Sequence, residues 1–325
     1  MSNQSLPLTK RVEKKNVDQI FFKEFGQEYL DYRERWKMAG KDFIPDFPVN
    51  LDIECTDDCN YRCNFCYRNN NSKITEDINT GARFDMGLYE KILKEGQENN
   101  LKAINFGFSG EPLTNSNLVE MVKMARKHGV IDIRIISNGG LLTQEKIEEL
   151  LKAGVTFFSL SIDAINEETY FKVKGSMLFH KVLESLKALY ETRERMGLSL
   201  PVIRASFYPN PENKGQEEQF IKMVSPFTDF VDIQTFSDIK DKGRELQIDY
   251  NCDMPFRRMG VFANGKVCCC CSFYSKLLIV GDAHKNTIKE IWNSAEVKAV
   301  RDSFINQKPN EICLRCLSAV CSKEE

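Results

Sequence analysis

Hydrophobic positions along the chain follow two alternating spacings. Six short runs rich in β-branched and aromatic residues predict buried strands, at residues 47–55, 102–110, 131–139, 156–164, 202–208 and 229–236. Between them, apolar residues recur every three or four positions, which predicts helices at residues 85–98, 116–128, 143–153, 178–196 and 213–224. A helix follows each of the first five strands.

This alternation predicts an α/β fold with parallel strands and right-handed crossovers, built as an open doubly wound sheet or as a full or partial barrel. The helix ends agree with it. Asp85 is placed to cap a helix N-terminus, and Gly129 and Gly154 fall where helix ends favour a left-handed residue. In either architecture, functional side chains gather at the carboxyl ends of the strands.

The two ends of the chain depart from the alternation. Residues 1–48 carry one helical pattern and no strand pattern, so we expect a helical extension whose aromatic face packs on the main body. After about residue 237 we expect a hairpin that turns at Asn264-Gly265 and a helix near 287–303. The predicted units are therefore an N-terminal extension (1–48), a barrel-like unit (49–236) and a small C-terminal unit (237–325).

Composition narrows the classes of partner. The 325 residues are 42% hydrophobic and 28% charged, which suits a large core with a smaller satellite unit. The net charge is −2 with both signs mixed along the chain, so no basic surface for nucleic acid is expected. We see no apolar signal segment and no run of about 20 apolar residues. We therefore expect no export and no membrane partner, and a cytoplasmic location.

The twelve cysteines fall into three clusters, with none between Cys66 and Cys252. Because a reducing cytosol disfavours disulfides, we interpret the clusters as sets of thiolate ligands. The clusters are Cys55, Cys59, Cys63 and Cys66; then Cys252, Cys268, Cys269, Cys270 and Cys271; then Cys313, Cys316 and Cys321.

The first cluster holds three cysteines at tight spacing on one predicted loop, Cys59-x3-Cys63-x2-Cys66. Three thiolates leave one metal position open for a cofactor or substrate, whereas a closed zinc or iron–sulfur site takes four. Cys55 lies within a predicted strand, which favours a buried thiol. A zinc knuckle that pairs Cys63-x2-Cys66 with Cys313-x2-Cys316 remains the alternative.

Three further motifs follow the next predicted strands: Ser109-Gly110-Glu111-Pro112, then SNG at 137–139, then SIDA at 161–164. Together with the cysteine triplet, and with Phe65 just before its third cysteine, this order resembles the radical S-adenosylmethionine (SAM) enzymes. Their GGEP motif has Gly where this chain has Ser109. The resemblance covers about residues 48–236 and implies a partial (β/α)6 barrel.

The resemblance also implies cofactors and the residues that bind them. Cys59, Cys63 and Cys66 would hold a [4Fe–4S] cluster, whose open iron would bind SAM for cleavage to a 5′-deoxyadenosyl radical. The implied cofactor contacts are Phe65, Gly110, Glu111, Ser137, Asn138, Ser161 and Asp163. A solvated loop carboxylate is the alternative for Glu111. Lys172 and Lys174 could neutralise the cofactor carboxylate, but we interpret them as surface lysines.

The C-terminal unit resembles the SPASM domain and its shorter Twitch form. Cys252, then Gly265-x4-Cys270, then Cys313-x2-Cys316 match that pattern, which implies one auxiliary [4Fe–4S] cluster held by Cys252, Cys270, Cys313 and Cys316. A second auxiliary cluster would require unusual ligands, because only Cys321 follows Cys316.

The run Cys268-Cys269-Cys270-Cys271 is the most unusual stretch of this unit. In extended backbone, Cys268 and Cys270 would share one face, and Cys269 and Cys271 the other. Those that do not bind the cluster would be buried thiols or hydrogen-atom donors to a substrate radical. The candidate donors are Cys268, Cys269, Cys271 and Cys321.

Three functions fit these features. The favoured one is a radical SAM oxidoreductase or epimerase for a small polar molecule such as a sugar, sugar nucleotide or aminocyclitol. Its partner would be a low-potential electron donor such as flavodoxin or ferredoxin. The alternatives are a peptide- or protein-modifying radical SAM enzyme and a non-enzymatic iron–sulfur or zinc protein.

Overall fold

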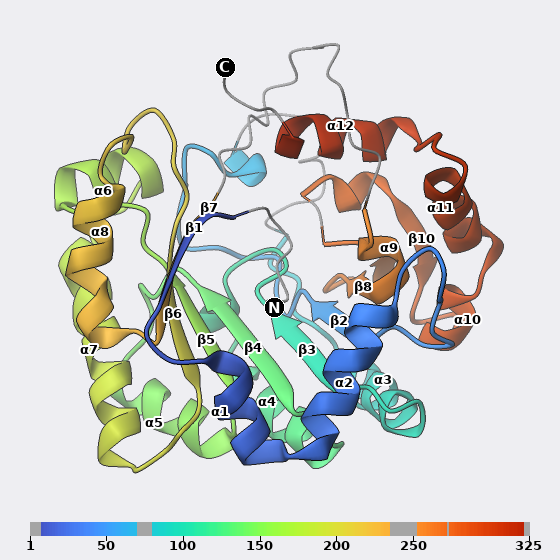
Figure 1. Cartoon of the computed structure of the whole chain (residues 1–325), viewed down its shortest axis with the longest axis horizontal. Coiled ribbons are helices and arrows are strands. Elements are labelled where there is room, and N and C mark those ends of the chain that lie inside the picture. Colours follow the sequence, from blue (N-terminus) through green and yellow to red (C-terminus); the bar gives the residue numbers. More distant parts are fainter. Residues whose placement is uncertain (1–7, 70–79, 235–251, 272, 322–325) are drawn as a thin grey trace.

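The computed structural model describes residues 8–69, 80–234, 252–271 and 273–321. Its strands form one mixed sheet in the order β1-β7-β6-β5-β4-β3-β2-β8-β9-β10 (Figure 1). Six central strands are parallel: β2 (Asn50–Ile53), β3 (Ala103–Phe106), β4 (Asp132–Ser137), β5 (Phe157–Ser161), β6 (Val202–Phe207) and β7 (Phe230–Gln234). The sheet does not close on itself, so the predicted partial barrel is confirmed.

Helices between the parallel strands cover the outer face of the sheet. All five predicted helices are present, as α3 (Met86–Glu98), α4 (Leu118–Lys127), α5 (Gln144–Ala153), α7 (Phe179–Arg195) and α8 (Glu217–Val224). Asp85 caps α3, and Gly129 and Gly154 have φ of +82° and +91°, as predicted. A sixth helix, α6 (Glu167–Lys174), was not predicted.

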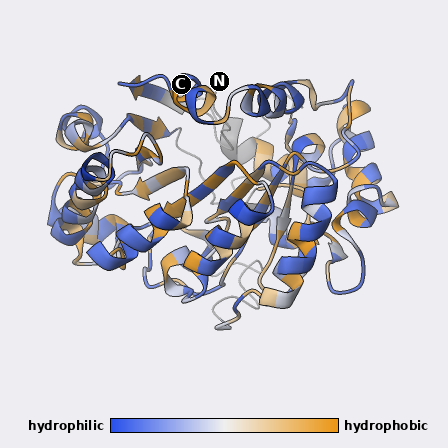
Figure 2. Cartoon of the chain, turned by 90° about the horizontal axis from the view of Figure 1, so that it is seen from below, coloured by the Kyte–Doolittle hydropathy of each residue, from blue (hydrophilic) through white to orange (hydrophobic). Residues whose placement is uncertain are grey.

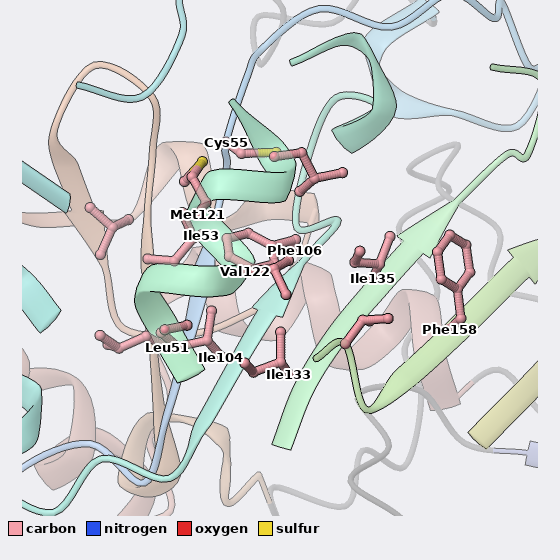
Figure 3. Packing of buried hydrophobic residues seen from close by; sticks show 14 of the residues in the cluster. Leu51, Ile53, Cys55, Ile104, Phe106, Met121, Val122, Ile133, Ile135 and Phe158 are labelled. Carbon is pink, nitrogen blue, oxygen red and sulfur yellow. The ribbon is translucent and has the colours of Figure 1, made fainter. Parts of the chain in front are cut away.

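The outward side chains of the strands build the main core with these helices. Figure 3 shows Leu51, Ile104 and Ile133 side by side on neighbouring strands, Val122 of α4 beside Phe106, and Cys55 beside Met121. Cys55 is a buried thiol, as predicted. The outer faces of the helices are hydrophilic (Figure 2).

The N-terminal region differs from its prediction. It begins with a strand, β1 (Leu8–Glu13), which pairs antiparallel with β7. The predicted single helix is two, α1 (Val17–Phe25) and α2 (Gln27–Met38), because Gly26 adopts a φ of +56° that interrupts the helix. The aromatic face of these helices packs as expected, against the inward residues at the starts of the strands, such as Phe157 and Phe230.

The C-terminal region continues the same sheet. β8 (Arg258–Val261) pairs parallel with β2, and β9 (Lys266–Cys268) and β10 (Ile279–Asp282) follow antiparallel. The hairpin that turns at Asn264-Gly265 is confirmed. The predicted helix at 287–303 is two, and the helices of this region are α9 (Met254–Arg257), α10 (Ile288–Trp292), α11 (Ala295–Ile305) and α12 (Glu311–Cys321).

Side-chain contacts dock this region on the barrel. The Glu95 carboxylate of α3 accepts from the backbone N–H groups of Ile288 and Lys289, 2.9 and 2.7 Å away, at the N-terminus of α10. Trp292 is fully buried and donates to the Pro45 carbonyl. The predicted boundary at 236/237 lies outside the described residues. None of the helices in the described ranges has the length and apolar character needed to cross a membrane.

Candidate active site at the strand ends

Cys59, Cys63 and Cys66 lie together on the loop that follows β2, and each is half-buried. Burial raises the pKa of the Cys63 thiol to about 12; the nearby charge of Lys174 lowers it, whereas Cys66 and Cys59 raise it. Burial also raises the pKa of Cys59 and of Cys66. The three thiols therefore share one electrostatic environment.

Backbone contacts with the end of α6 position this loop. The Asn64 N–H donates to the Val173 carbonyl at 2.9 Å, and the Asn64 side-chain amide donates to the Lys172 carbonyl at 3.0 Å. Gly175, which follows α6, has a φ of +63°, and a Cβ there would lie 2.8 Å from the Arg62 carbonyl oxygen. The helix α6, which the hydrophobic pattern does not predict, therefore supports the cysteine loop.

Lys174 is not a surface lysine, contrary to our prediction. Its side chain is 3% exposed, and its ammonium lies 2.5 Å from Asp163 and 5.4 Å from the ring centre of Phe65. Burial disfavours its charged form, but Asp163 and Cys63 more than compensate and raise the pKa of Lys174. Lys172, by contrast, is exposed and pairs with Glu168, as a surface lysine would.

Glu111 is buried and bonded to the loop that follows β4. Its carboxylate accepts from the Ser137 hydroxyl at 2.7 Å, the Asn138 N–H at 2.8 Å and the Leu113 N–H at 3.1 Å. Burial raises the pKa of Glu111 although these hydrogen bonds lower it. The alternative of a solvated loop carboxylate is wrong. The Asn138 side chain in turn donates to Asn60 of the cysteine loop at 2.9 Å.

The backbone at Gly110 approaches the entry to the cysteine loop closely. Its φ is +61°, and a Cβ there would lie 2.2 Å from the Thr56 carbonyl oxygen. Ser109, which departs from the family motif, uses its hydroxyl group for two side-chain hydrogen bonds. Its hydroxyl lies 2.8 Å from the Tyr67 hydroxyl and accepts from the buried Arg68 guanidinium at 3.0 Å.

Two more predicted contacts lie at the end of β5, and a third, Phe65 of the cysteine loop, packs against the end of β6. Asp163 has a left-handed φ of +61° and accepts from the Tyr208 N–H at 2.7 Å. Phe65 packs on the Tyr208 ring at 4.8 Å. The Ser161 hydroxyl lies 3.2 Å from that of Ser206, on the inner face of the barrel. Phe65, Asp163 and Lys174 thus lie near Cys63, whereas Ser161 faces inward.

The four consecutive cysteines do not alternate as predicted, because β9 ends at Cys268. Cys268 and Cys269 are both fully buried, whereas Cys270 and Cys271 are partly exposed. Cys268 lies opposite Gly260 of β8, and a Cβ at Gly260 would lie 2.7 Å from its sulfur. Cys269 belongs to the main core. The side chain of Cys321 lies outside the described part of the chain.

A second group of thiols gathers around Cys252. Burial raises the pKa of Cys252 to about 12, and the neighbouring thiols Cys271, Cys316 and Cys313 raise it as well. Cys313 and Cys316 lie three positions apart on α12, which puts them on one helix face. Cys271 is thus a second candidate for the fourth ligand of this group, beside Cys270, whose ligand role stays a prediction.

The donor sets fit iron–sulfur clusters. Each group is made of thiols alone, and such sets suit these clusters better than hard cations. Within the described ranges, no three His, Cys, Asp or Glu side chains are arranged to hold a metal ion. The assignment to iron–sulfur clusters therefore rests on the chemistry of the thiol donors and on the protein families that the chain resembles.

Two protein-family models match the chain. The model of the radical SAM superfamily matches residues 53–203, and the model of the SPASM iron–sulfur cluster-binding domain matches residues 252–317. The chain therefore contains a radical SAM domain followed by a C-terminal SPASM domain, and its cofactors are [4Fe–4S] clusters and SAM.

Curated relatives match about half of the chain. A "Tungsten-containing aldehyde ferredoxin oxidoreductase cofactor-modifying protein" of Pyrococcus furiosus is 31% identical over 167 residues, which are 51% of this chain and 45% of the relative. A "Probable GTP 3',8-cyclase" of Saccharolobus islandicus is 28% identical over 174 residues, 54% and 52% of the two chains. The chain thus spans about half the length of these relatives.

Solved structures share the fold over most of the chain. BtrN in complex with AdoMet and 2-DOIA has a TM-score of 0.56 at 17% identity and covers 86% of this chain and 95% of that one. Streptococcus suis SuiB bound to precursor peptide SuiA has a TM-score of 0.60 at 14% identity, with 92% and 76% covered. At these identities the likeness concerns the fold alone.

Proposed function

We propose that this protein is a radical SAM enzyme that dehydrogenates or epimerises a small polar molecule, such as a sugar, a sugar nucleotide or an aminocyclitol. The polar inner face of the barrel carries this proposal. Inward positions on β4–β7 hold Arg134, Ser159, Arg204 and Asp232, whereas outward positions on the same strands are apolar. A lining of hydrogen-bonding groups suits a substrate that carries polar groups of its own.

In this proposal Cys59, Cys63 and Cys66 hold the [4Fe–4S] cluster to which SAM binds. Together these cofactors supply the 5′-deoxyadenosyl radical that removes a hydrogen atom from the substrate. Lys174, held by Asp163, would present its positive charge to the cofactor carboxylate.

The other predicted contacts orient the cofactor. Because the Glu111 carboxylate already accepts three hydrogen bonds, its role would be to fix the loops that carry Gly110, Ser137 and Asn138. The backbone of those loops would then bind the cofactor. Phe65 and Ser161 would contact it with their side chains.

The C-terminal thiols would decide the outcome of the substrate radical. Cys252, Cys313 and Cys316, with Cys270 or Cys271, would hold one auxiliary cluster that accepts an electron during dehydrogenation. In epimerisation a C-terminal thiol would donate its hydrogen atom, and the candidate is Cys268, whose sulfur lies against Gly260 of β8, whereas Cys269 lies in the core. A low-potential donor of the flavodoxin or ferredoxin kind would then supply the electron that restores the thiol together with a proton.

The test is SAM cleavage by the anaerobically reconstituted, reduced protein, measured as 5′-deoxyadenosine. The wild type should form this product. A variant with Cys59, Cys63 and Cys66 all changed to Ala should form none, yet keep the iron of the auxiliary site. Cleavage at the wild-type rate by this variant would refute the assignment.

The choice between the two outcomes needs a second measurement. For an epimerase, Cys268→Ala should abolish incorporation of solvent deuterium into the product and spare cluster iron, whereas Cys269→Ala should not change incorporation. Release of an oxidised product without deuterium would identify a dehydrogenase. A product found only with a peptide as substrate would instead support the peptide-modifying alternative.

A further inference from the structure

Solvent reaches the inner face of the barrel below the cysteine loop. The side chains of Arg11 on β1, Arg134 on β4 and Arg204 on β6 are 22%, 16% and 12% exposed. Their outward neighbours Ile133 and Ile203 are fully buried under the helices. The inner arginine cluster, which consists of Arg11, Arg134 and Arg204 with Asp132 and Asp232, is therefore accessible from the barrel interior.

The charges of this cluster do not balance. Arg134 binds Asp132 through two hydrogen bonds of 2.8 and 2.9 Å. Asp232 is shared, since Arg11 binds it at 2.8 and 3.0 Å and Arg204 at 3.2 Å. Among the residues that the structure describes, three guanidinium groups thus face two carboxylates, which leaves one positive charge of the cluster without a counter-ion.

The nearby charges of α1 and α2 do not supply that counter-ion. Arg33 lies 4.0 Å from Asp18, so this pair is neutral by itself. Tyr32 donates its hydroxyl hydrogen to Asp132 at 3.0 Å and is uncharged at neutral pH. The surplus charge therefore stays with the arginines on the strands.

Two of the guanidinium groups are held in fixed orientations. Arg134 and Arg204 pack over the ring of Phe157, with distances of 4.4 and 5.7 Å from the guanidinium carbon to the ring centre. The Nε of Arg204 also donates to the Ser159 hydroxyl at 2.8 Å. One terminal nitrogen of each, Nη1 of Arg134 and Nη2 of Arg204, donates to no protein atom among the described residues.

The cluster lies beneath the site where the radical would form. Arg204 pairs with Ser159 in the sheet, and Ser206 pairs with Ser161 two residues nearer the carboxyl ends of the strands. Two residues of strand span about 7 Å. A small substrate in the barrel would therefore reach from the strand ends to Arg204.

We propose that the inner arginine cluster binds an oxyanion of the substrate, a carboxylate or a phosphate, at a level two strand residues, or about 7 Å, below Ser161 and Ser206. This inference rests on the proposed function of the same barrel. Unpartnered N–H groups on two rigid guanidinium planes suit the oxygens of such an anion, and the surplus positive charge is neutralised by it. An ammonium group is repelled, so the substrate is a phosphorylated or carboxylated sugar rather than an aminocyclitol.

A second observation agrees with this assignment. Burial, together with the charges of Arg134 and Arg11, lowers the pKa of Arg204, although Asp232 acts in the opposite direction. A bound anion removes part of that repulsion.

Equilibrium binding to the SAM-loaded holoprotein under anaerobic conditions tests the proposal. The probes are glucose 6-phosphate, glucuronate, glucose and glucosamine, measured by calorimetry at constant ionic strength. We expect one or both anionic sugars to bind more tightly than glucose, and glucosamine not to bind. The phosphate and the carboxylate probes distinguish the two sources of the oxyanion.

Variants locate the binding. Arg204→Gln and Arg134→Gln should each weaken anion binding roughly 10- to 100-fold, the effect of losing a hydrogen bond to a charged group. Arg204→Lys keeps the charge and should weaken it less. Arg195→Gln, which removes an exposed arginine of α7 paired with Glu148, is the matched control and should bind like the wild type.

Equal binding of all four sugars by the wild type, no binding of either anion, or unchanged anion binding in both glutamine variants would overturn this proposal. Its failure is distinct from failure of the proposed function. A wild type that cleaves SAM but shows no preference for anions refutes only the oxyanion site. A wild type that forms no 5′-deoxyadenosine refutes the proposed function.

Discussion

The two groups of cysteines are built in different ways. Cys59, Cys63 and Cys66 lie within eight consecutive residues of one loop, which neighbouring elements hold in place. The group around Cys252 is assembled from three separate segments, since Cys271 follows β9 and Cys313 and Cys316 lie on α12. A site within one loop is defined by sequence spacing, whereas a site assembled from distant segments is defined only by the fold.

The sharpest test of this difference is the identity of the fourth thiol in the second group. Cys271→Ala should lose all auxiliary iron and keep the iron of the first site, whereas Cys270→Ala should keep both. Iron content and the electron paramagnetic resonance of the reduced protein measure this directly. The reverse result, with iron lost only in Cys270→Ala, would support Cys270, the ligand predicted from sequence spacing.

The first group should depend on its neighbours, above all on Lys174. Lys174→Met leaves the Asp163 carboxylate buried without its partner, so the free energy of unfolding should fall by about 3 to 5 kcal/mol. Chemical denaturation measures the loss, and Lys172→Met, which changes an exposed lysine of the same helix, should unfold like the wild type.

The effect of Lys174→Met should also be independent of pH near neutrality. Because the folded-state pKa of Lys174 is raised above 10.5, its contribution is fully present below that value and is lost only as the pH rises through the folded-state pKa. The free energies of unfolding of Lys174→Met and Lys172→Met should therefore differ by the same amount at pH 7 and at pH 9. A difference that shrinks between these values would contradict the buried ion pair.

Close backbone packing at Gly110 should contribute nearly as much to the free energy of unfolding as Lys174 does. Gly110→Ala adds a Cβ that would lie 2.2 Å from a backbone oxygen and strains a left-handed φ, so it should cost about 3 kcal/mol. Gly26 has a similar φ, but a Cβ added there would lie within 4 Å of nothing. Gly26→Ala should therefore lower the free energy of unfolding by about 1 kcal/mol, through backbone strain alone. Equal thermal stability of the two variants would show that the approach to Thr56 is unimportant.

The smallest effect concerns Ser109. Ser109→Gly restores the residue typical of the family and removes the hydroxyl that contacts Tyr67 and Arg68. We expect a loss of about 1 kcal/mol in the free energy of unfolding, measured by chemical denaturation, because one modest hydrogen-bonding centre disappears. A stabilised variant would mean that the departure from the family motif serves another purpose.

Much of the fold could be predicted because the outward side chains of the strands and helices are apolar at regular spacings. The strand β1 does not show in the hydrophobic pattern because it carries Lys10, Arg11 and Glu13, and its pairing with β7 is a contact between distant segments. The interpretation of the strands as continuous apolar runs does not predict the inward charges of Arg134 on β4 and Arg204 on β6.

The site was predictable where it depends on local spacing and not where it depends on packing. The cysteine loop and the motifs after β3, β4 and β5 could be recognised from order alone. Burial of Lys174 could not, because its helix had to be placed against the cysteine loop first. The alternation expected for Cys268 to Cys271 failed because it assumed a strand longer than β9.

The pairing of β8 with β2 has a consequence for dissection of the protein. Because the C-terminal hairpin extends the barrel sheet, removing residues 252–325 would uncover the backbone N–H and C=O groups along one edge of β2. An exposed parallel edge of this kind is a template for pairing between molecules. Truncation at this junction should therefore yield self-associating chains rather than a separable catalytic module.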